Sequence, residues 1–171
     1  MLPESVGVGN MSSKKLLSNA GKYLVAARLT LMGYVVRITE EEAPVADIEV
    51  RDPEKGRSSL IKVKTTKEEV VLLGVEATRE NLDEKLDRKI TRPHVIVHLT
   101  DKLDIARFYI VPAKDLKELA KRGYLAWLER GMKHLWKTKE EQEKHARTPQ
   151  PLSVSIKDLT QYLEKWENIW T

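Results

Sequence analysis

The chain has 171 residues, of which 41% are hydrophobic and 33% charged, enough for one domain with a sizeable core and a heavily charged surface. It contains no cysteine, which excludes disulfides and cysteine metal sites and is typical of a reducing cytoplasm. A net charge of +4 and a pI of about 9.2 are compatible with a nucleic-acid partner. No apolar run approaches the ~20 residues of a membrane span, and the N-terminus lacks the basic-then-apolar order of a secretory signal. We therefore expect a cytoplasmic protein without a membrane partner.

The N-terminal part predicts an arm, a helix and a strand. Residues 1–11 contain proline and glycine without periodicity, which is typical of a flexible arm. A helix is expected to begin after a serine cap at Ser12 or Ser13 and to end at Gly33. Its apolar residues recur at helical spacing: Leu16, Leu17, Ala20, Leu24, Ala27 and Leu31. Residues 34–38 are strand-like, and the acidic stretch 40–44 predicts a loop.

Two short strands, residues 45–51 and 60–66, are predicted to pair as a hairpin across a polar turn. Asp47 and Glu49 alternate with apolar residues in the first strand, and Lys62 and Lys64 do so in the second. Two carboxylates beside two ammonium groups on one surface can hold a divalent metal and a phosphate together. The alternative is an ordinary solvated face, where cross-strand ion pairs add only ~0.2–1 kcal/mol each.

The remainder of the chain predicts three more strands and several helices. Strands are expected at 70–75 (a buried type), 94–99 and 106–111, and an exposed short helix or loop at 81–89. An amphipathic helix is expected at 114–129, in one piece or broken at Gly123. Residues 132–147 are predicted to be helical or partly disordered, and 148–151 to be a linker. The last helix carries an apolar stripe of Tyr162, Trp166, Ile169 and Trp170. This order predicts an α/β fold with a central mixed sheet flanked by helices.

Several short motifs, in this order, resemble the PD-(D/E)-X-K nuclease superfamily, also called restriction-endonuclease-like, and its small prokaryotic branch in particular. The matching pieces are GKYLVAA at 21–27 with GY at 33–34, ADI at 46–48, IKVKTT at 61–66, VIVHL at 95–99, FYIVP at 108–112 and KWE at 165–167. The resemblance covers roughly residues 12–170. It implies a nuclease-like core at 12–112 and a helical C-terminal extension, 113–171, packed on that core.

The superfamily's reaction is metal-assisted phosphodiester hydrolysis, so the resemblance implies Mg²⁺ or Mn²⁺ as cofactor and nucleic acid, foremost DNA, as substrate. It implies that Asp47 ligates the metal with help from Glu49. Lys64 would stabilise the attacking water or the scissile phosphate, and Lys62 would add positive charge there. Glu76 is a more distant candidate ligand. The expected backbone-contacting residues, each alternatively a solvated surface charge, are Lys14, Lys15, Arg37 and Lys67.

Two positions depart from the superfamily's pattern. Lys62 stands where a Glu or Gln is usual, and its ammonium group repels a cation. Lys22 stands where the first helix often carries Glu. The alternative function is therefore a catalytically degenerate module that binds nucleic acid or a protein without cutting. A third hypothesis is a structural subunit of a nuclease or defence complex, with a homodimer or another protein held through the C-terminal helices.

Histidines and tryptophans offer weaker signals. His94 and His98 share one face of a predicted strand, which suits a metal pair or, more simply, two sheet residues near a sheet end. Four tryptophans could stack on nucleic-acid bases, although their helical spacing favours packing in the core: Trp127, Trp136, Trp166 and Trp170.

Overall fold

The computed structural model describes residues 13–39, 46–100 and 106–171. The first half contains α1 (Ser13–Leu31), β1 (Val35–Ile38), β2 (Ile48–Asp52), β3 (Arg57–Thr66), β4 (Val70–Ala77) and α2 (Leu82–Lys89). The second half contains β5 (His94–Leu99), β6 (Ala106–Val111), α3 (Ala113–Arg130), the π-helical turn η1 (Gly131–Leu135), α4 (Lys139–Arg147), β7 (Gln150–Ser155) and the 3-10 segments η2 (Ile156–Tyr162) and η3 (Trp166–Trp170). The expected N-terminal arm, the acidic loop and Val45 lie outside the described residues.

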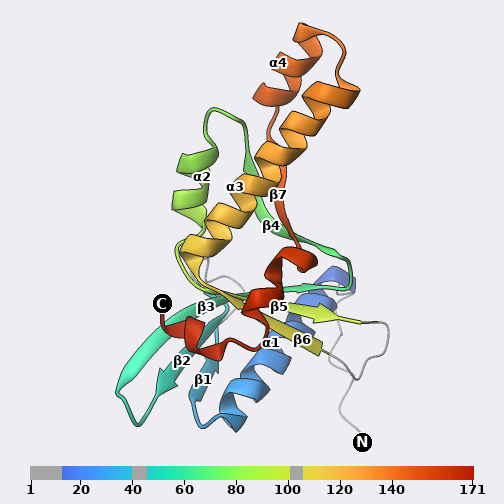
Figure 1. The fold of residues 1–171 in the computed structure, drawn as a ribbon. Coiled ribbons are helices and arrows are strands. Elements are labelled where there is room, and N and C mark those ends of the chain that lie inside the picture. The colour runs from blue at the N-terminus through green and yellow to red at the C-terminus, as the bar shows by residue number, and fades with distance from the viewer. Residues whose placement is uncertain (1–12, 40–45, 101–105) are drawn as a thin grey trace, which may run out of the picture.

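The fold is α/β with a central mixed sheet of five strands, as the sequence predicts. The strand order is β1-β2-β3-β5-β6, in which β3 and β5 run parallel and all other neighbours run antiparallel. Strands β4 and β7 form a separate antiparallel pair. Figure 1 shows α3 and α4 extending away from the five-stranded sheet alongside these two strands. The predicted hairpin is confirmed as β2 and β3, with Ile48 opposite Ile61.

Apolar side chains form one cluster on each face of the five-stranded sheet. The first cluster joins α1 and the C-terminal segment to the sheet through Val25, Leu29, Ile48, Val50, Ile61, Val63, Val95, Val97, Ile110, Trp166 and Ile169. The second joins α2, α3, β4 and β7 to β5 and β6 through Leu82, Leu86, Ile96, Tyr109, Val111, Leu116, Leu128, Leu152 and Val154, among others. This second cluster contains residues of β5 and β6 but none of β2 or β3, so on β2 and β3 the same face of the sheet can carry charged side chains.

Helix α1 has the expected length but buries a different face from the one its leucines indicate. Gly21, Val25 and Leu29 are its buried residues. Leu16 is 54% exposed and Leu31 85% exposed. Both faces of this helix are apolar enough to be buried, and the close fit of Gly21 against the sheet decides between them.

Strands β4 and β7 differ from what the sequence predicts. Residues 70–75 read as a fully buried strand, but β4 alternates, with Val70 and Leu72 exposed and Val71 and Leu73 buried. The predicted linker at 148–151 is also wrong in part, because Gln150 and the residue after it belong to β7. Each strand of this pair leaves one face to water, which explains the alternation.

The helices beyond β4 mostly follow the sequence expectations. Residues 82–89 form a helix that docks through Leu82 and Leu86. Helix α3 continues through Gly123 without a break. Residues 139–147 form α4, which begins at a capping box between Thr138 and Glu141. In the part of the chain that the structure describes, no helix has both the length and the apolar character needed to cross a membrane.

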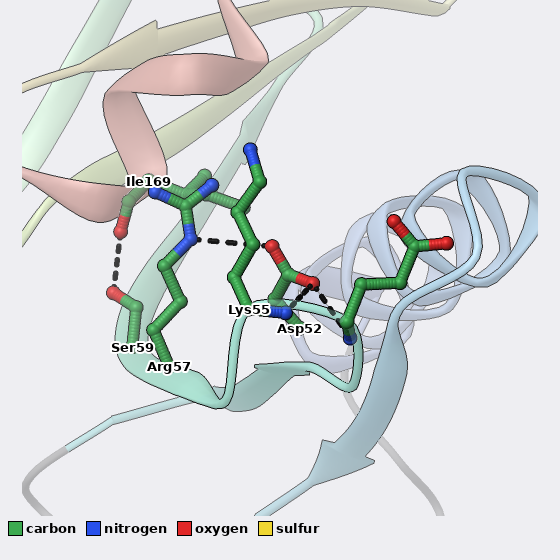
Figure 2. A network of polar contacts seen from close by, with 6 residues as sticks. Asp52, Lys55, Arg57, Ser59 and Ile169 are labelled. Atoms are coloured by element: carbon green, nitrogen blue, oxygen red, sulfur yellow. Dashed lines mark hydrogen bonds and ion pairs between the residues drawn. The ribbon is translucent and has the colours of Figure 1, made fainter.

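The predicted last helix is wrong: the chain ends in two 3-10 segments. The N–H of Glu164 bonds the Phe108 carbonyl at 2.8 Å, and Nδ2 of Asn168 bonds the Ile110 carbonyl at 2.8 Å. These bonds tie the segment to β6 and interrupt a continuous α-helical ladder. Figure 2 shows the Ser59 hydroxyl donating to the Ile169 carbonyl, beside the turn that Asp52 organises. The segment is therefore anchored to both β3 and β6.

Candidate functional site

Asp47 lies directly before β2, and its carboxylate joins three elements. Oδ2 accepts a hydrogen bond from the Val63 N–H at 2.9 Å. The Asp47 N–H in turn donates to the carbonyl of Ile61, two residues before Val63 on β3. Oδ1 lies 3.0 Å from Nζ of Lys22 in α1. Oδ2 lies 4.0 Å from Nζ of Lys62 in β3. The side chain thus extends the β2–β3 ladder and gathers lysines from two elements.

A close contact between α1 and β3 places Lys22 at this carboxylate. Gly21 is buried, and a Cβ added to it would lie 1.8 Å from Oγ1 of Thr65. Only glycine lets the helix approach β3 this closely. The Lys22 side chain, 13% exposed, emerges at this contact and reaches Asp47.

Lys62 and Lys64 lie on one face of β3 because side chains alternate along a strand. The Lys62 side chain is 27% exposed. Lys64 reaches toward β4, where a Cβ added to Gly74 would lie 3.3 Å from its Nζ. Burial lowers the pKa of Lys64; Asp47 acts against this shift, and Lys62 and Lys22 reinforce it. Lys64 therefore loses its proton more readily than an exposed lysine.

His94 borders the same cluster from β5. It lies opposite Lys62 in the parallel register, and its side chain is buried. Burial lowers the pKa of His94 to about 4, against a favourable bond between Nδ1 and the Arg92 carbonyl at 2.9 Å. His94 is accordingly neutral at neutral pH and adds no charge to the site.

The cluster of Asp47, Lys22, Lys62 and Lys64, hereafter the lysine cluster, carries one carboxylate and three ammonium groups. Both Asp47 oxygens already meet donors. Glu49, the expected second ligand, instead accepts from Nε of Arg37 at 2.9 Å. A hard divalent cation needs several free oxygen ligands. This donor set does not fit Mg²⁺ or Mn²⁺, and the described residues contain no group of three or more His, Cys, Asp or Glu that could hold a metal ion.

The other predicted site residues lie at varying positions around the lysine cluster. Lys14 and Lys15 lie in the first turn of α1, and Lys67 lies just beyond the end of β3. Lys15 precedes Lys22 by two helical turns and shares its side of α1. Glu76 is exposed on β4 and lines an open hollow with Lys85, Lys89 and neighbours. The role of each of these residues remains a prediction.

The candidate histidine pair and the tryptophans lie mainly in packed positions. His98 is buried at the far end of β5 from His94. Trp166 belongs to the sheet core, while Trp127 and Trp136 pack edge to face, with ring centroids 5.3 Å apart. Trp127 and Trp136 are partly buried and pack against the second apolar cluster, so packing accounts for these side chains, as their spacing favours.

The sequence did not predict that Lys22 or His94 would lie beside Asp47 and Lys62. Lys22 was visible only as a departure from a motif, and its approach to Asp47 depends on the Gly21 contact. His94 becomes a neighbour of Lys62 only through the parallel β3–β5 register. For Lys22, the available signal was an unusual lysine at a motif position beside a glycine. For His94, no local signal indicates that it lies beside Lys62.

No family model matches this chain, and no curated protein matches its sequence. Among solved structures, it is similar to a bacterial homing endonuclease, I-Ssp6803I, with a TM-score of 0.46 and 18% sequence identity. The alignment covers 94% of this chain and 93% of that chain. At this score and identity the likeness establishes neither a shared fold nor a shared activity.

Proposed function

We propose that this protein binds the phosphodiester backbone of nucleic acid, with duplex DNA as the first substrate to test, and holds it without hydrolysis. The observation that carries the proposal is the excess of charge at the lysine cluster. One carboxylate, Asp47, faces ammonium groups of Lys22 and Lys62, and Lys64 lies close enough for Asp47 to influence its pKa.

The chemistry of the cluster suits a phosphate better than a metal. Each lysine ammonium has three donors, and Asp47 occupies only part of that capacity. The remaining donors can bind phosphate oxygens, and such contacts supply affinity that does not depend on base sequence. The ion pair of Asp47 with Lys22, 3.0 Å long, lowers the local positive charge but does not cancel it.

The test is the affinity for a labelled DNA duplex, measured by fluorescence anisotropy at several salt concentrations in the presence of EDTA. Wild type should bind with a linear dependence of log affinity on log salt. Lys62→Ala should weaken binding and reduce the slope by about 0.9 for one lost phosphate contact. The matched control is Lys117→Ala, since Lys117 is 29% exposed, pairs with Asp87 at 2.7 Å and lies on α3. This control should leave affinity and slope unchanged.

Two results would overturn the binding proposal. One is a wild-type protein that remains folded and shows no salt-dependent affinity for DNA. The other is an equal loss of affinity in Lys62→Ala and Lys117→Ala, which would mean that any surface lysine contributes alike.

Hydrolysis of the bound phosphodiester is the second candidate, and the lowered pKa of Lys64 is the observation that favours it. A lysine that loses its proton more easily is better suited to proton transfer than an ordinary one. The same duplex, incubated with Mg²⁺ or Mn²⁺, distinguishes the candidates. Cutting that is lost in both Asp47→Ala and Lys64→Ala would establish hydrolysis and overturn binding without cleavage.

A further inference from the structure

Helix α1 carries a second apolar stripe that no other described element covers. It consists of Leu16, Ala20, Tyr23, Leu24, Ala27 and Leu31, all of which are exposed. Tyr23 is 64% exposed and Leu31 85% exposed. The stripe lies on the opposite side of the helix from Gly21, Val25 and Leu29, which face the sheet.

The order of residues in the stripe is symmetric about the midpoint between Tyr23 and Leu24. When the helix is reversed by a 180° rotation about this midpoint, Leu16 takes the position of Leu31, Ala20 that of Ala27, and Tyr23 that of Leu24. Large residues therefore meet large residues, and small meet small. A two-fold interface requires this kind of self-complementary surface.

We propose that two copies of this chain pair through α1, with the two helices antiparallel and related by a two-fold axis at Tyr23 and Leu24. This interface is independent of the lysine cluster and of the function proposed for it. It also differs from the predicted pairing through the C-terminal segment, whose Trp166 and Ile169 are buried within the chain.

The charges of α1 agree with this pairing. The helix has four cations, Lys14, Lys15, Lys22 and Arg28, and no acidic residue. In the antiparallel register these positions lie level along the helix axis with Gly33, Met32, Val25 and Asn19 of the second copy, so no cation lies level with another cation. Lys22 is also turned away from the stripe, toward Asp47. Arg28 is already paired with Glu164 at 3.2 Å. Self-association in this register brings apolar surfaces together without like-charge repulsion.

The geometry of helix packing also suits the stripe. It spans 16 residues, or about 24 Å of helix. Ala20 and Ala27 on either side of the axis allow the close approach that packed helices need. A single helix pair is a small interface, so we expect a dimer that dissociates at micromolar concentrations.

The register is tested by disulfide crosslinking, because the chain has no cysteine of its own. Full-length Ala20→Cys and Ala27→Cys proteins are oxidised separately and as a mixture. The mixture should form a disulfide-linked pair of the two variants, because these positions face each other across the axis. Each variant alone should crosslink far less, since the single cysteines of its two copies would lie about 10 Å apart along the helix axis. Leu135→Cys mixed with Ala27→Cys reports random collision, since Leu135 is 66% exposed and lies outside α1.

The association is tested by sedimentation velocity across the micromolar range. Wild type should shift from monomer to dimer as concentration rises. Ala20→Glu with Ala27→Glu places like charges opposite one another twice and should abolish the dimer. Ala20→Glu with Ala27→Lys places opposite charges there and should retain it. Circular dichroism should show the same helix content in both double variants, because the altered positions are exposed.

Three outcomes overturn the proposal. They are a wild-type protein that stays monomeric throughout, a dimer equally stable in both double variants, and crosslinking that is no greater in the Ala20→Cys and Ala27→Cys mixture than in the collision control. A monomeric wild type would leave the stripe to a different partner.

Discussion

Strand β2 is bounded by two carboxylates, Asp47 before its first residue and Asp52 at its last, and their surroundings differ. Oδ1 of Asp52 accepts from the N–H groups of Glu54 and Lys55 at 3.1 Å each, and Oδ2 accepts from Nε of Arg57 at 3.2 Å. All these donors lie within five residues along the chain. Figure 2 shows them gathered at the turn. Asp52 therefore closes a hairpin with one cation and local donors.

Asp47 draws its donors from distant parts of the chain. Lys22 comes from α1, and Val63 and Lys62 come from the second strand of the hairpin.

Burial acts to raise the pKa of Asp52, but hydrogen bonds from Lys55, Arg57 and Glu54 outweigh it and the pKa lies below its ordinary value. The Asp52 site is thus balanced, with one cation for one carboxylate, whereas Asp47 is outnumbered by lysines. The proposed phosphate site rests on this excess of positive charge beside Asp47.

Neutralising Asp47 should change stability and DNA binding more than the other substitutions. Asp47→Asn keeps an oxygen that can accept from the Val63 N–H but leaves three neighbouring lysines without their carboxylate. We expect a loss of about 3 kcal/mol in the free energy of unfolding, the low end for a largely buried ion pair that loses one partner. We also expect tighter binding to DNA at low salt, because the cluster becomes more positive. Urea unfolding and fluorescence anisotropy measure the two effects, and weaker DNA binding by a folded Asp47→Asn would contradict a phosphate site.

An intermediate effect is expected from separating Lys22 from Asp47 without changing either. Gly21→Ala places a methyl group 1.8 Å from Oγ1 of Thr65, so α1 must shift away from β3. We expect a loss of about 2 kcal/mol in unfolding free energy from overpacking.

The matched control for this change is Gly123→Ala within α3, where the nearest atom to the added Cβ is the Ser153 carbonyl oxygen at 3.4 Å. Because alanine favours helix over glycine, this variant should be neutral or more stable by about 0.5–1 kcal/mol. Thermal unfolding of both variants tests the pair. Equal stability of the two would show that the contact of α1 with β3 is looser than the structure indicates.

The smallest effect is expected at the turn. Asp52→Asn can still accept from the Glu54 and Lys55 N–H groups and loses mainly its charge interaction with Arg57, whose side chain is 40% exposed. Asp52 is buried, but the Arg57 end of the pair stays in contact with water, so we expect a loss of about 1 kcal/mol in unfolding free energy, that of one hydrogen bond. DNA affinity should not change. Altered DNA binding in Asp52→Asn would mean that the turn also contacts DNA, which would contradict the distinction between a binding role for the Asp47 site and a structural role for Asp52.

Much of the fold was predictable because its patterns are local. The period-two alternation in β2 and β3 identified the hairpin and the shared surface of Asp47, Lys62 and Lys64. Other elements were not predictable from such patterns. VVLLGV at 70–75 reads the same whether both faces or one face is covered, and its partner β7 lies about 80 residues away in the chain. The C-terminal tryptophans have helical spacing, but hydrogen bonds from the Glu164 N–H and the Asn168 side chain to β6 hold the segment in tighter turns.

For the candidate site, local sequence was enough to predict that one acidic and two basic side chains share a surface, because strand alternation depends only on neighbouring residues. The packing of the whole chain was needed to bring Lys22 to them, to pair Glu49 with Arg37, and to bury Lys64 enough to lower its pKa. It also decided which apolar face of α1 is left exposed. These outcomes depend on which elements pack together across long separations in the chain. Packing is a collective result of fit, such as that of Gly21 against Thr65, which no single segment encodes.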